Sequence, residues 1–291
     1  MKMMEGFTRT EIKTSGANIV TVHGGKGPPL LLIHGNPFTH LSWHKFAPRL
    51  AQDFTVVAID LRGYGDSSKP PGGEKHENYS FRNMALDGIE VMAHLGHRKF
   101  MVAGHDRGGR VVHRMCLDHP DNVERAAILD IIPQHHLLNN VTRQWGTFSW
   151  HWFFNIQPEP LPEKMMGADP DWFIQRKLAK TPQGLSFFGK EALAEYMRCF
   201  RNPETIHAIC EDYRAAAGID LEHDAADAEA RITAPLLALW GAKGVVGRTY
   251  DVLETWREKA TDVSGRALDC GHTLQEERPD AVLSELAAFL R

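Results

Sequence analysis

Gly104-His105-Asp106-Arg107-Gly108 joins a short apolar run, Phe100-Met101-Val102-Ala103, to a stretch with helical spacing from Arg110 to His119. A sharp turn from a strand into a helix needs glycines on both sides of its central residue, where other side chains would clash. The stretch therefore matches the G-x-S-x-G nucleophile elbow, with Asp106 in the serine position. The alternative is an aspartate that serves only as a helix N-cap.

Further apolar runs bounded by turn residues recur along the chain and are separated by helical patterns such as Met84 to Leu95. Runs of this length are typical of strands buried on both faces of a parallel sheet. The alternation predicts an α/β fold that closes with a helix from about Pro279 to Leu290. The runs are Leu30 to Ile33, Phe54 to Ile59, Ala126 to Leu129, Pro235 to Trp240 and Arg266 to Leu268.

The alternation of strand and helix patterns stops in the middle of the chain. From about Gln134 to Gly218 the sequence is rich in Trp, Phe, Met and Pro and shows no clear buried strand, which indicates a mostly helical insertion over the sheet. We predict a core formed by residues 1–133 and 219–291, interrupted by a helical cap at residues 134–218.

Composition excludes several classes of protein. The 33 Lys+Arg and 37 Asp+Glu give a net charge of −4, so no basic field favours nucleic acid or a membrane surface. The sequence has no signal-peptide pattern and no apolar run of about 18 residues. Its four cysteines, Cys116, Cys199, Cys210 and Cys270, are scattered and form no C-x-x-C. We expect reduced thiols and a cytoplasmic location.

An aspartate nucleophile predicts a two-step reaction. A carboxylate is ionised at neutral pH, so it can displace a leaving group from a tetrahedral carbon without a base. Water must then hydrolyse the resulting ester, and this step needs a general base. His272 follows the last strand, where an elbow fold presents its histidine. The alternative is an ordinary surface histidine.

The acid that orients His272 is assigned by elimination. The strand that follows the cap ends in Trp240-Gly241-Ala242-Lys243-Gly244 and offers no acidic residue. Asp130 ends the strand before the cap, so we assign it to the triad; a strand-end cap is the alternative. Backbone N–H groups of Asn36, in His34-Gly35-Asn36-Pro37, and of Arg107 are the expected oxyanion donors.

The chain resembles the fluoroacetate (haloacetate) dehalogenases of the α/β-hydrolase superfamily over nearly its whole length. That resemblance implies an eight-stranded, mostly parallel sheet flanked by helices, with an inserted helical cap. The stretches that carry it are Gly104 to Arg110, Leu129-Asp130-Ile131, His151-Trp152, Gln157-Pro158-Glu159-Pro160, Asp212-Tyr213-Arg214-Ala215 and Gly271-His272.

The resemblance also implies roles for five further side chains. Arg107 and Arg110 would hold the substrate carboxylate, and a helix N-terminus with two guanidinium groups suits such an anion. His151, Trp152 and Tyr213 would bind the departing halide through N–H and O–H donors. A solvated helix face for Arg110 and a core aromatic for Trp152 are the alternatives.

The chain departs from the family pattern at two positions beside these residues. Asn36 stands where members often carry an aromatic residue, and Thr273 stands where they often carry Phe. Haloalkane dehalogenases often have Asn at the first position, where it holds halide together with a Trp after the nucleophile; here Arg107 replaces that Trp. We expect these changes to affect pocket size or halide preference and to leave the triad unchanged.

The leading hypothesis is a hydrolytic dehalogenase that converts short 2-haloacids such as fluoroacetate or chloroacetate to glycolate and halide. The resemblance implies a homodimer, with no cofactor and no metal. An epoxide hydrolase would use the same triad but normally needs two cap tyrosines; Tyr196 and Tyr213 are the candidates. A non-catalytic ligand-binding protein is the third hypothesis, and the intact triad argues against it.

Overall fold

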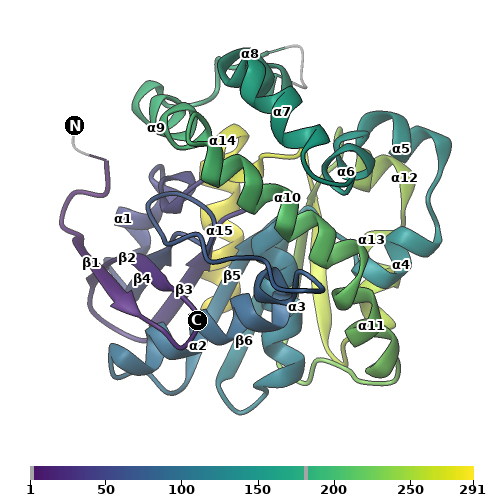
Figure 1. The fold of residues 1–291 in the computed structure, drawn as a ribbon. Helices are drawn as coiled ribbons and strands as arrows, with labels where there is room; N and C mark the ends of the chain where they lie inside the picture. Colours follow the sequence, from purple (N-terminus) through teal and green to yellow (C-terminus); the bar gives the residue numbers. More distant parts are fainter. Residues whose placement is uncertain (1–2, 180–182) are drawn as a thin grey trace.

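A computed structural model describes residues 3–179 and 183–291 and shows one eight-stranded sheet in the order β1-β2-β4-β3-β5-β6-β7-β8 (Figure 1). Strand β2 runs antiparallel to both of its neighbours, whereas every pair from β4 to β8 is parallel. The strands are β1 (Thr8–Lys13), β2 (Asn18–Gly25), β3 (Pro29–Ile33), β4 (Thr55–Ile59), β5 (Phe100–His105), β6 (Val123–Leu129), β7 (Leu236–Gly241) and β8 (Val263–Leu268). This is the predicted mostly parallel α/β sheet.

Every strand from β3 to β8 coincides with one of the predicted apolar runs. In β5 all six residues are buried, as expected of a central strand covered on both faces. The antiparallel strands β1 and β2 were not located from sequence. In β1 one residue of six, Ile12, is buried, so this edge strand carries little apolar signal.

Alternate residues of the strands enter two cores, one on each face of the sheet. Leu31 of β3 packs with residues of α2 and α3, while Leu30 and Leu32 pack on the opposite face with residues of α1 and α15. The helices and short 3-10 turns of the core are η1 (His40–Trp43), α1 (Ala47–Leu50), η2 (Glu77–Tyr79), α2 (Phe81–His94), α3 (Arg107–Asp118), α12 (Val245–Thr249), α13 (Val252–Arg257), α14 (Leu274–Glu277) and α15 (Pro279–Leu290). The predicted C-terminal helix is confirmed by α15.

Between β6 and β7 lies a long segment that is helical and, in its described residues, contains no β-strand; we call it the helical insertion. Helices α5 to α9 lie above the sheet in Figure 1, whereas α11 lies beside it. They are α4 (Gln134–Asn139), α5 (Arg143–Phe148), α6 (His151–Asn155), α7 (Leu161–Ala168), α8 (Pro170–Leu178), α9 (Lys190–Phe200), α10 (Pro203–Ala217) and α11 (Ile219–Ala226). The predicted division of the chain at residues 133 and 218 stays a prediction.

Helix α10 anchors the insertion to the core. Its N-cap Asn202 accepts a hydrogen bond from the backbone N–H of Glu204, and Pro203 occupies the first helical position. Most of its residues are buried, and it contacts α6, α7, α9, α11 and η2. Helix α10 therefore carries its side chains, Asp212 and Tyr213 among them, over the edge of the sheet at which the parallel strands end.

The described part of the chain includes no helix with the length and apolar character that a membrane crossing requires. All four cysteines are buried and unpaired. Burial raises the pKa of the Cys116 thiol to about 12, so this thiol stays protonated at neutral pH.

Candidate active site

The turn at Asp106 has the backbone of a strained elbow. Asp106 lies between β5 and α3 with φ 52° and ψ −116°, a conformation that residues other than glycine rarely adopt. A Cβ atom at Gly104 would lie 2.3 Å from the carbonyl oxygen of Gly108, and one at Gly108 would lie 2.2 Å from the carbonyl oxygen of Ile33. The two glycines are therefore required by close backbone contacts, as the elbow pattern predicts.

Asp106, His272 and Asp130 are connected by two successive side-chain contacts. The His272 Nε2 atom is 3.3 Å from Asp106 Oδ2, and the His272 Nδ1–H donates to Asp130 Oδ2 at 2.5 Å. The other Asp130 oxygen accepts the backbone N–H of Gly241 at 2.8 Å. Asp130 thus fixes the ring orientation of His272, and the second ring nitrogen faces the carboxylate of Asp106.

Three side chains that the sequence analysis did not select hold the His272 loop. The His105 Nε2–H donates to the carbonyl oxygen of His272 at 2.9 Å, and Gln275 Nε2 lies 3.1 Å from His105 Nδ1. Burial and the charge of His272 lower the pKa of His105 to about 3, so the ring is neutral and can donate at one nitrogen while it accepts at the other. The carboxylate of Glu277 accepts the N–H groups of Gly271 and Thr273.

The charges of the triad favour an ionised Asp106 and a protonated His272 in the resting state. Burial alone would raise the pKa of Asp106, but the hydrogen bond and charge of His272, with His105 and Arg107 nearby, hold it well below its usual range. Burial lowers the pKa of His272, but its contacts with Asp106 and Asp130 outweigh this and raise it to about 9. Loss of the Asp106 charge would therefore lower the pKa of His272.

Asn36 links the nucleophile to the helical insertion. Its backbone N–H donates to Asp106 Oδ1 at 3.0 Å, which is the contact expected of an oxyanion donor. Its side-chain Nδ2 donates to the Tyr213 hydroxyl oxygen at 3.0 Å. Both residues are buried. The other expected donor, the N–H of Arg107, belongs to the residue that begins α3 directly after Asp106.

A cavity of about 670 Å³ lies between the sheet and the helical insertion. Its wall includes the triad and most of the other side chains selected from the sequence; only Arg107 of that set is absent from it. The selected residues that line it are Asn36, Asp106, Arg110, Asp130, His151, Trp152, Tyr213 and His272. Sequence positions that are far apart therefore meet in one space of a size suited to a small ligand.

Arg110 of α3 places a guanidinium in the wall of this cavity, which Arg248 and Arg278 also line. Its Nη1 donates to the carbonyl oxygen of Ile132 at 3.3 Å, its Nε has no partner among the described residues, and its Cζ lies 4.9 Å from the centre of the Trp152 ring. Burial and the charge of Arg107 lower its pKa to about 10, so it remains charged at neutral pH. A buried cation with a free donor is suited to bind an anion.

Arg107 lies behind the cavity wall. Its side chain is fully buried and forms an ion pair with Asp212 on α10, which also accepts a hydrogen bond from the Tyr64 hydroxyl. The guanidinium Cζ lies 4.4 Å from the centre of the Tyr213 ring and 5.2 Å from that of Trp152. Its Nη1 has no hydrogen-bond partner among the described residues. The predicted carboxylate contact of Arg107 stays a prediction that depends on this one donor.

His151, Trp152 and Tyr213 form one aromatic group on the insertion side of the cavity. The centre of the Tyr213 ring is 5.9 Å from that of His151 and 5.1 Å from that of Trp152, both edge to face. Helix α6 supplies the first two residues and α10 the third. Their N–H and O–H groups therefore belong to one wall, opposite the strand ends that carry Asp106.

Comparison with known proteins identifies the family. The family profile of the alpha/beta hydrolase fold matches residues 28–279. The chain belongs to this family. In this alpha/beta hydrolase, Asp106 lies at the turn between β5 and α3.

Three relatives are similar over nearly the full length of this alpha/beta hydrolase. A fluoroacetate dehalogenase from Burkholderia sp. is 43 % identical over 99 % of this chain and 95 % of its own. A soluble epoxide hydrolase from Corynebacterium sp. (strain C12) is 33 % identical over 99 % of this chain and 98 % of its own. The crystal structure of an alpha/beta hydrolase from Nostoc sp. PCC 7120 is 54 % identical, with a TM-score of 0.96 over 98 % of each chain.

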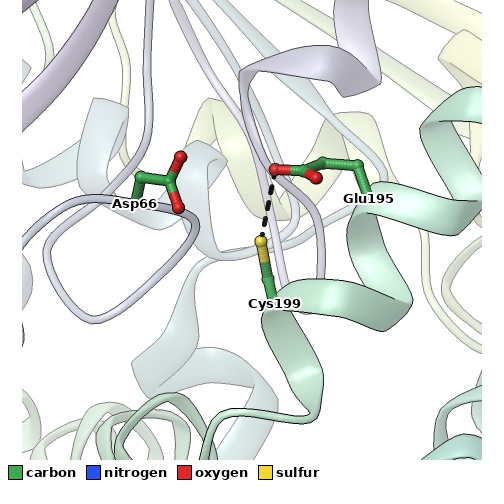
Figure 2. A group of neighbouring side chains, drawn as sticks. All are labelled: Asp66, Glu195 and Cys199. Carbon is green, nitrogen blue, oxygen red and sulfur yellow. Dashed lines mark hydrogen bonds between the residues drawn. The ribbon is translucent and has the colours of Figure 1, made fainter.

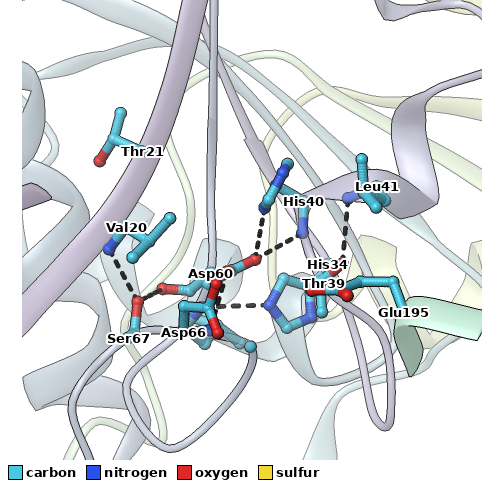
Figure 3. Close-up of polar contacts among 12 residues, drawn as sticks. Val20, Thr21, His34, Thr39, His40, Leu41, Asp60, Asp66, Ser67 and Glu195 are labelled. Carbon is cyan, nitrogen blue, oxygen red and sulfur yellow. Dashed lines mark hydrogen bonds and ion pairs between the residues drawn. The ribbon is translucent and has the colours of Figure 1, made fainter. Parts of the chain in front are cut away.

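This alpha/beta hydrolase has a second aspartate–histidine pair, with a buried aspartate and a partly buried histidine, shown in Figure 3. Asp60 follows β4, and its Oδ1 accepts hydrogen bonds from the backbone N–H of His40 at 2.7 Å and from His40 Nδ1–H at 2.8 Å. Its Oδ2 accepts the N–H of Asp66 at 3.2 Å. The His34 Nε2 accepts the N–H of Leu61 at 3.1 Å, and burial lowers the pKa of His34 to about 4. These contacts hold the loops beside the elbow.

Asp66, Glu195 and Cys199 lie close enough together to be considered as metal ligands (Figure 2). Arg198 donates to both carboxylates, and Arg9 donates to Asp66 at 3.0 Å. Burial raises the pKa of the Cys199 thiol well above its usual range, which opposes the thiolate form that binds metals. The arginines already balance these acidic groups, so we assign no metal to them in this alpha/beta hydrolase.

Proposed function

We propose that this hydrolase removes halide from short 2-haloacids and converts fluoroacetate or chloroacetate to glycolate. The observation that carries the proposal is the shared wall of one cavity, which is lined by Asp106, by Arg110 and by His151, Trp152 and Tyr213. The 43 % identity with a fluoroacetate dehalogenase supports the same substrate class.

In the first step Asp106 attacks the carbon that bears the halogen. Its Oδ1 is engaged by the Asn36 N–H, which leaves Oδ2 as the attacking oxygen. A C–O ester bond forms, the C–halogen bond breaks, and the halide departs with the bonding electron pair. Arg110 holds the substrate carboxylate, and N–H and O–H donors from the aromatic wall stabilise the charge that develops on the halide.

In the second step water hydrolyses the Asp106 ester. Ester formation removes the negative charge that keeps His272 protonated, so His272 becomes a base only after the halide has left. It takes a proton from water, and the hydroxide attacks the carbonyl carbon of Asp106. The oxyanion forms on Oδ1, where the Asn36 N–H is already in contact. Collapse of the intermediate releases glycolate and restores the Asp106 carboxylate.

The second candidate is an epoxide hydrolase, favoured by the 33 % identity with a soluble epoxide hydrolase. That reaction normally needs two tyrosine hydroxyl groups beside the nucleophile. Tyr213 lines the cavity, but the hydroxyl of Tyr196 donates to Glu276 at 3.1 Å, outside the set of cavity-lining residues. One tyrosine instead of two favours the dehalogenase.

The deciding experiment measures halide release from fluoroacetate and chloroacetate, side by side, with Asp106→Asn as the control. We expect both halides to be released by the wild type and neither by the variant. Chloride without fluoride would retain the mechanism and reject the assignment of the aromatic wall. No halide from either substrate, with turnover of styrene oxide, would replace the dehalogenase with the epoxide hydrolase.

We further propose that the protein forms a homodimer through the helical insertion. All the large apolar side chains found exposed among the described residues lie in this segment: Val141, Trp150, Phe153, Leu161, Met165 and Trp172. Exposed apolar side chains concentrated in one segment of a chain are typical of a protein contact. Light scattering should give the mass of a dimer for the wild type and of a monomer for Met165→Glu/Trp172→Glu, with the exposed-loop variant Lys26→Glu as a dimeric control. A monomeric wild type would reject this proposal.

A further inference from the structure

The Asn36 side chain touches the Tyr213 hydroxyl at a point where this chain departs from the family that it resembles. We propose that Asn36 is a positioning residue that acts through Tyr213, aims its O–H into the cavity and so tunes the site toward fluoride. The inference rests on the proposed dehalogenation for its role in turnover. It assigns to the Asn36 amide a task separate from that of its backbone N–H.

The geometry gives the hydrogen bond a direction. Asn36 Nδ2 donates to the Tyr213 oxygen at 3.0 Å, and the two residues are 5 % and 1 % exposed. A phenol oxygen that accepts one hydrogen bond still carries its own O–H as a donor. Because Tyr213 lines the cavity, this O–H can point toward an anion there. An aromatic side chain at position 36 would offer no such amide donor.

The hydrogen bond from Asn36 to Tyr213 should strengthen a hydrogen bond from the Tyr213 O–H to an anion in the cavity. Donation from Asn36 withdraws electron density from the phenol oxygen, which makes the Tyr213 O–H a better donor to an anion. Asn36 also donates its backbone N–H to Asp106 Oδ1, so one residue contacts both the nucleophile and the halide wall. A change of the Asn36 side chain leaves this backbone contact available.

Fluoride gains more from such a donor than chloride does. Its charge is concentrated on a smaller ion, so its hydrogen bonds are stronger and more sensitive to the direction of the donor. The arrangement therefore predicts that loss of the Asn36 amide weakens fluoride binding and fluoride release while chloride changes little.

The first test measures halide ions alone and does not depend on turnover. Sodium fluoride and sodium chloride are titrated by fluorine and chlorine NMR into Asp106→Asn protein, which lacks the repelling carboxylate. Asn36→Leu, Tyr213→Phe and their combination are compared in that background. We expect Asn36→Leu to weaken fluoride binding about 10-fold and chloride binding less than about 3-fold. In the Tyr213→Phe background it should have no further effect.

Trp152→Phe provides the matched control, because Trp152 belongs to the same wall but, among the described residues, it is Tyr213 and not Trp152 that the Asn36 side chain contacts by a hydrogen bond. The effects of Asn36→Leu and Trp152→Phe should multiply. Equal losses for fluoride and chloride, or a loss from Asn36→Leu that persists without the Tyr213 hydroxyl, would overturn the inference. The second result would mean that Asn36 contacts halide directly.

Turnover by the same variants with Asp106 restored separates this inference from the proposed function. We expect Asn36→Leu to lower kcat for fluoroacetate about 10-fold, with KM and the chloroacetate rate nearly unchanged. A wild type that releases no halide but shows the Asn36–Tyr213 coupling in ion binding would reject the dehalogenase and keep the inference. Turnover without that coupling would reject the inference and keep the dehalogenase.

Discussion

Two aspartate–histidine pairs lie at the carboxyl ends of parallel strands in this molecule, Asp130–His272 after β6 and Asp60–His40 after β4. In each pair a carboxylate oxygen accepts the histidine Nδ1–H, at 2.5 Å and 2.8 Å respectively. In each pair the aspartate also accepts a backbone N–H, from Gly241 and from His40. Residue type, strand position and hydrogen bonding are therefore nearly the same.

The pairs differ in what lies beyond the histidine. His272 Nε2 is 3.3 Å from the Asp106 carboxylate and lines the cavity, whereas His40 is not among its lining residues. Asp60 uses its remaining oxygen to hold the loop at Asp66. An aspartate–histidine pair thus becomes a candidate for catalysis through a third group and a space for substrate, and without them it holds loops together.

The largest expected contrast is in catalysis. His272→Asn should release one equivalent of halide and then stop, which lowers steady-state turnover by about 10³–10⁴-fold because the ester has no base. His40→Asn should keep turnover per folded molecule within about 3-fold. Rapid-quench halide assay and intact-mass spectrometry check both. Absence of a covalent adduct in His272→Asn would contradict the two-step route.

A reverse contrast is expected in stability. Asp60→Asn should lower the free energy of unfolding by about 3 kcal/mol, because it leaves buried donors around His40 without their charged partner. Asp106→Asn should lower it by less, because relief of the strained backbone at Asp106 offsets part of the stability that its contact with His272 contributes. Urea unfolding of the two variants measures the difference. A larger loss for Asp106→Asn than for Asp60→Asn would contradict this expectation.

The stability contributed by Asp60 should depend on pH in a defined window. Burial raises its pKa, but His40 outweighs this and lowers it from 3.8 to about 2, so this contribution is full above about 4 and is lost as pH falls through 2. Burial lowers the pKa of His40, but Asp60 raises it above 6.5, so the pairing weakens as pH rises past that raised value. The difference in unfolding free energy between wild type and Asp60→Asn should be largest between pH 4 and 6.5. Urea unfolding at several pH values would contradict this if the difference were constant.

The smallest effect concerns the pH at which His272 becomes a base. Its resting pKa of about 9 depends on Asp106 as well as Asp130, so the ester intermediate should have a lower value. When ester hydrolysis limits turnover, kcat should rise with pH and level off below 9. The halide burst of the wild type should stay nearly constant from pH 5 upward, because Asp106 remains ionised beside His272. A kcat that still rises above pH 9 would contradict the charge coupling.

The sequence predicted the parts of the fold and site that local pattern determines. Apolar runs located β3 to β8, and the glycines beside Asp106 predicted the elbow. Edge strand β1 was missed because Ile12 is its one buried residue. The order of strands along the chain then placed Asp130 and His272 at the sheet edge that carries Asp106.

Contacts between distant positions could not be predicted in this way. Asn36 and Tyr213 are 177 positions apart, and Arg107 and Asp212 are 105 apart. Nothing in either neighbourhood indicates which side chain the other will meet, since the insertion sets their spacing. The placement of Arg107 behind the wall, rather than in it, follows from such a contact. The resemblance supplied the identity of these residues but not their geometry.

The backbone at Asp106 is fixed by Gly104 and Gly108 and by the carbonyl groups that they approach, and the carboxylate has no part in that fit. The residue type at this position can consequently change over evolution without altering the join between strand and helix. An exchange of aspartate for serine would keep the histidine, the oxyanion donor and the cavity, and it would replace the displacement at saturated carbon that we propose with attack on a carbonyl group. At this turn, the reaction type depends on the side chain of residue 106, whereas the fold depends on the glycines beside it.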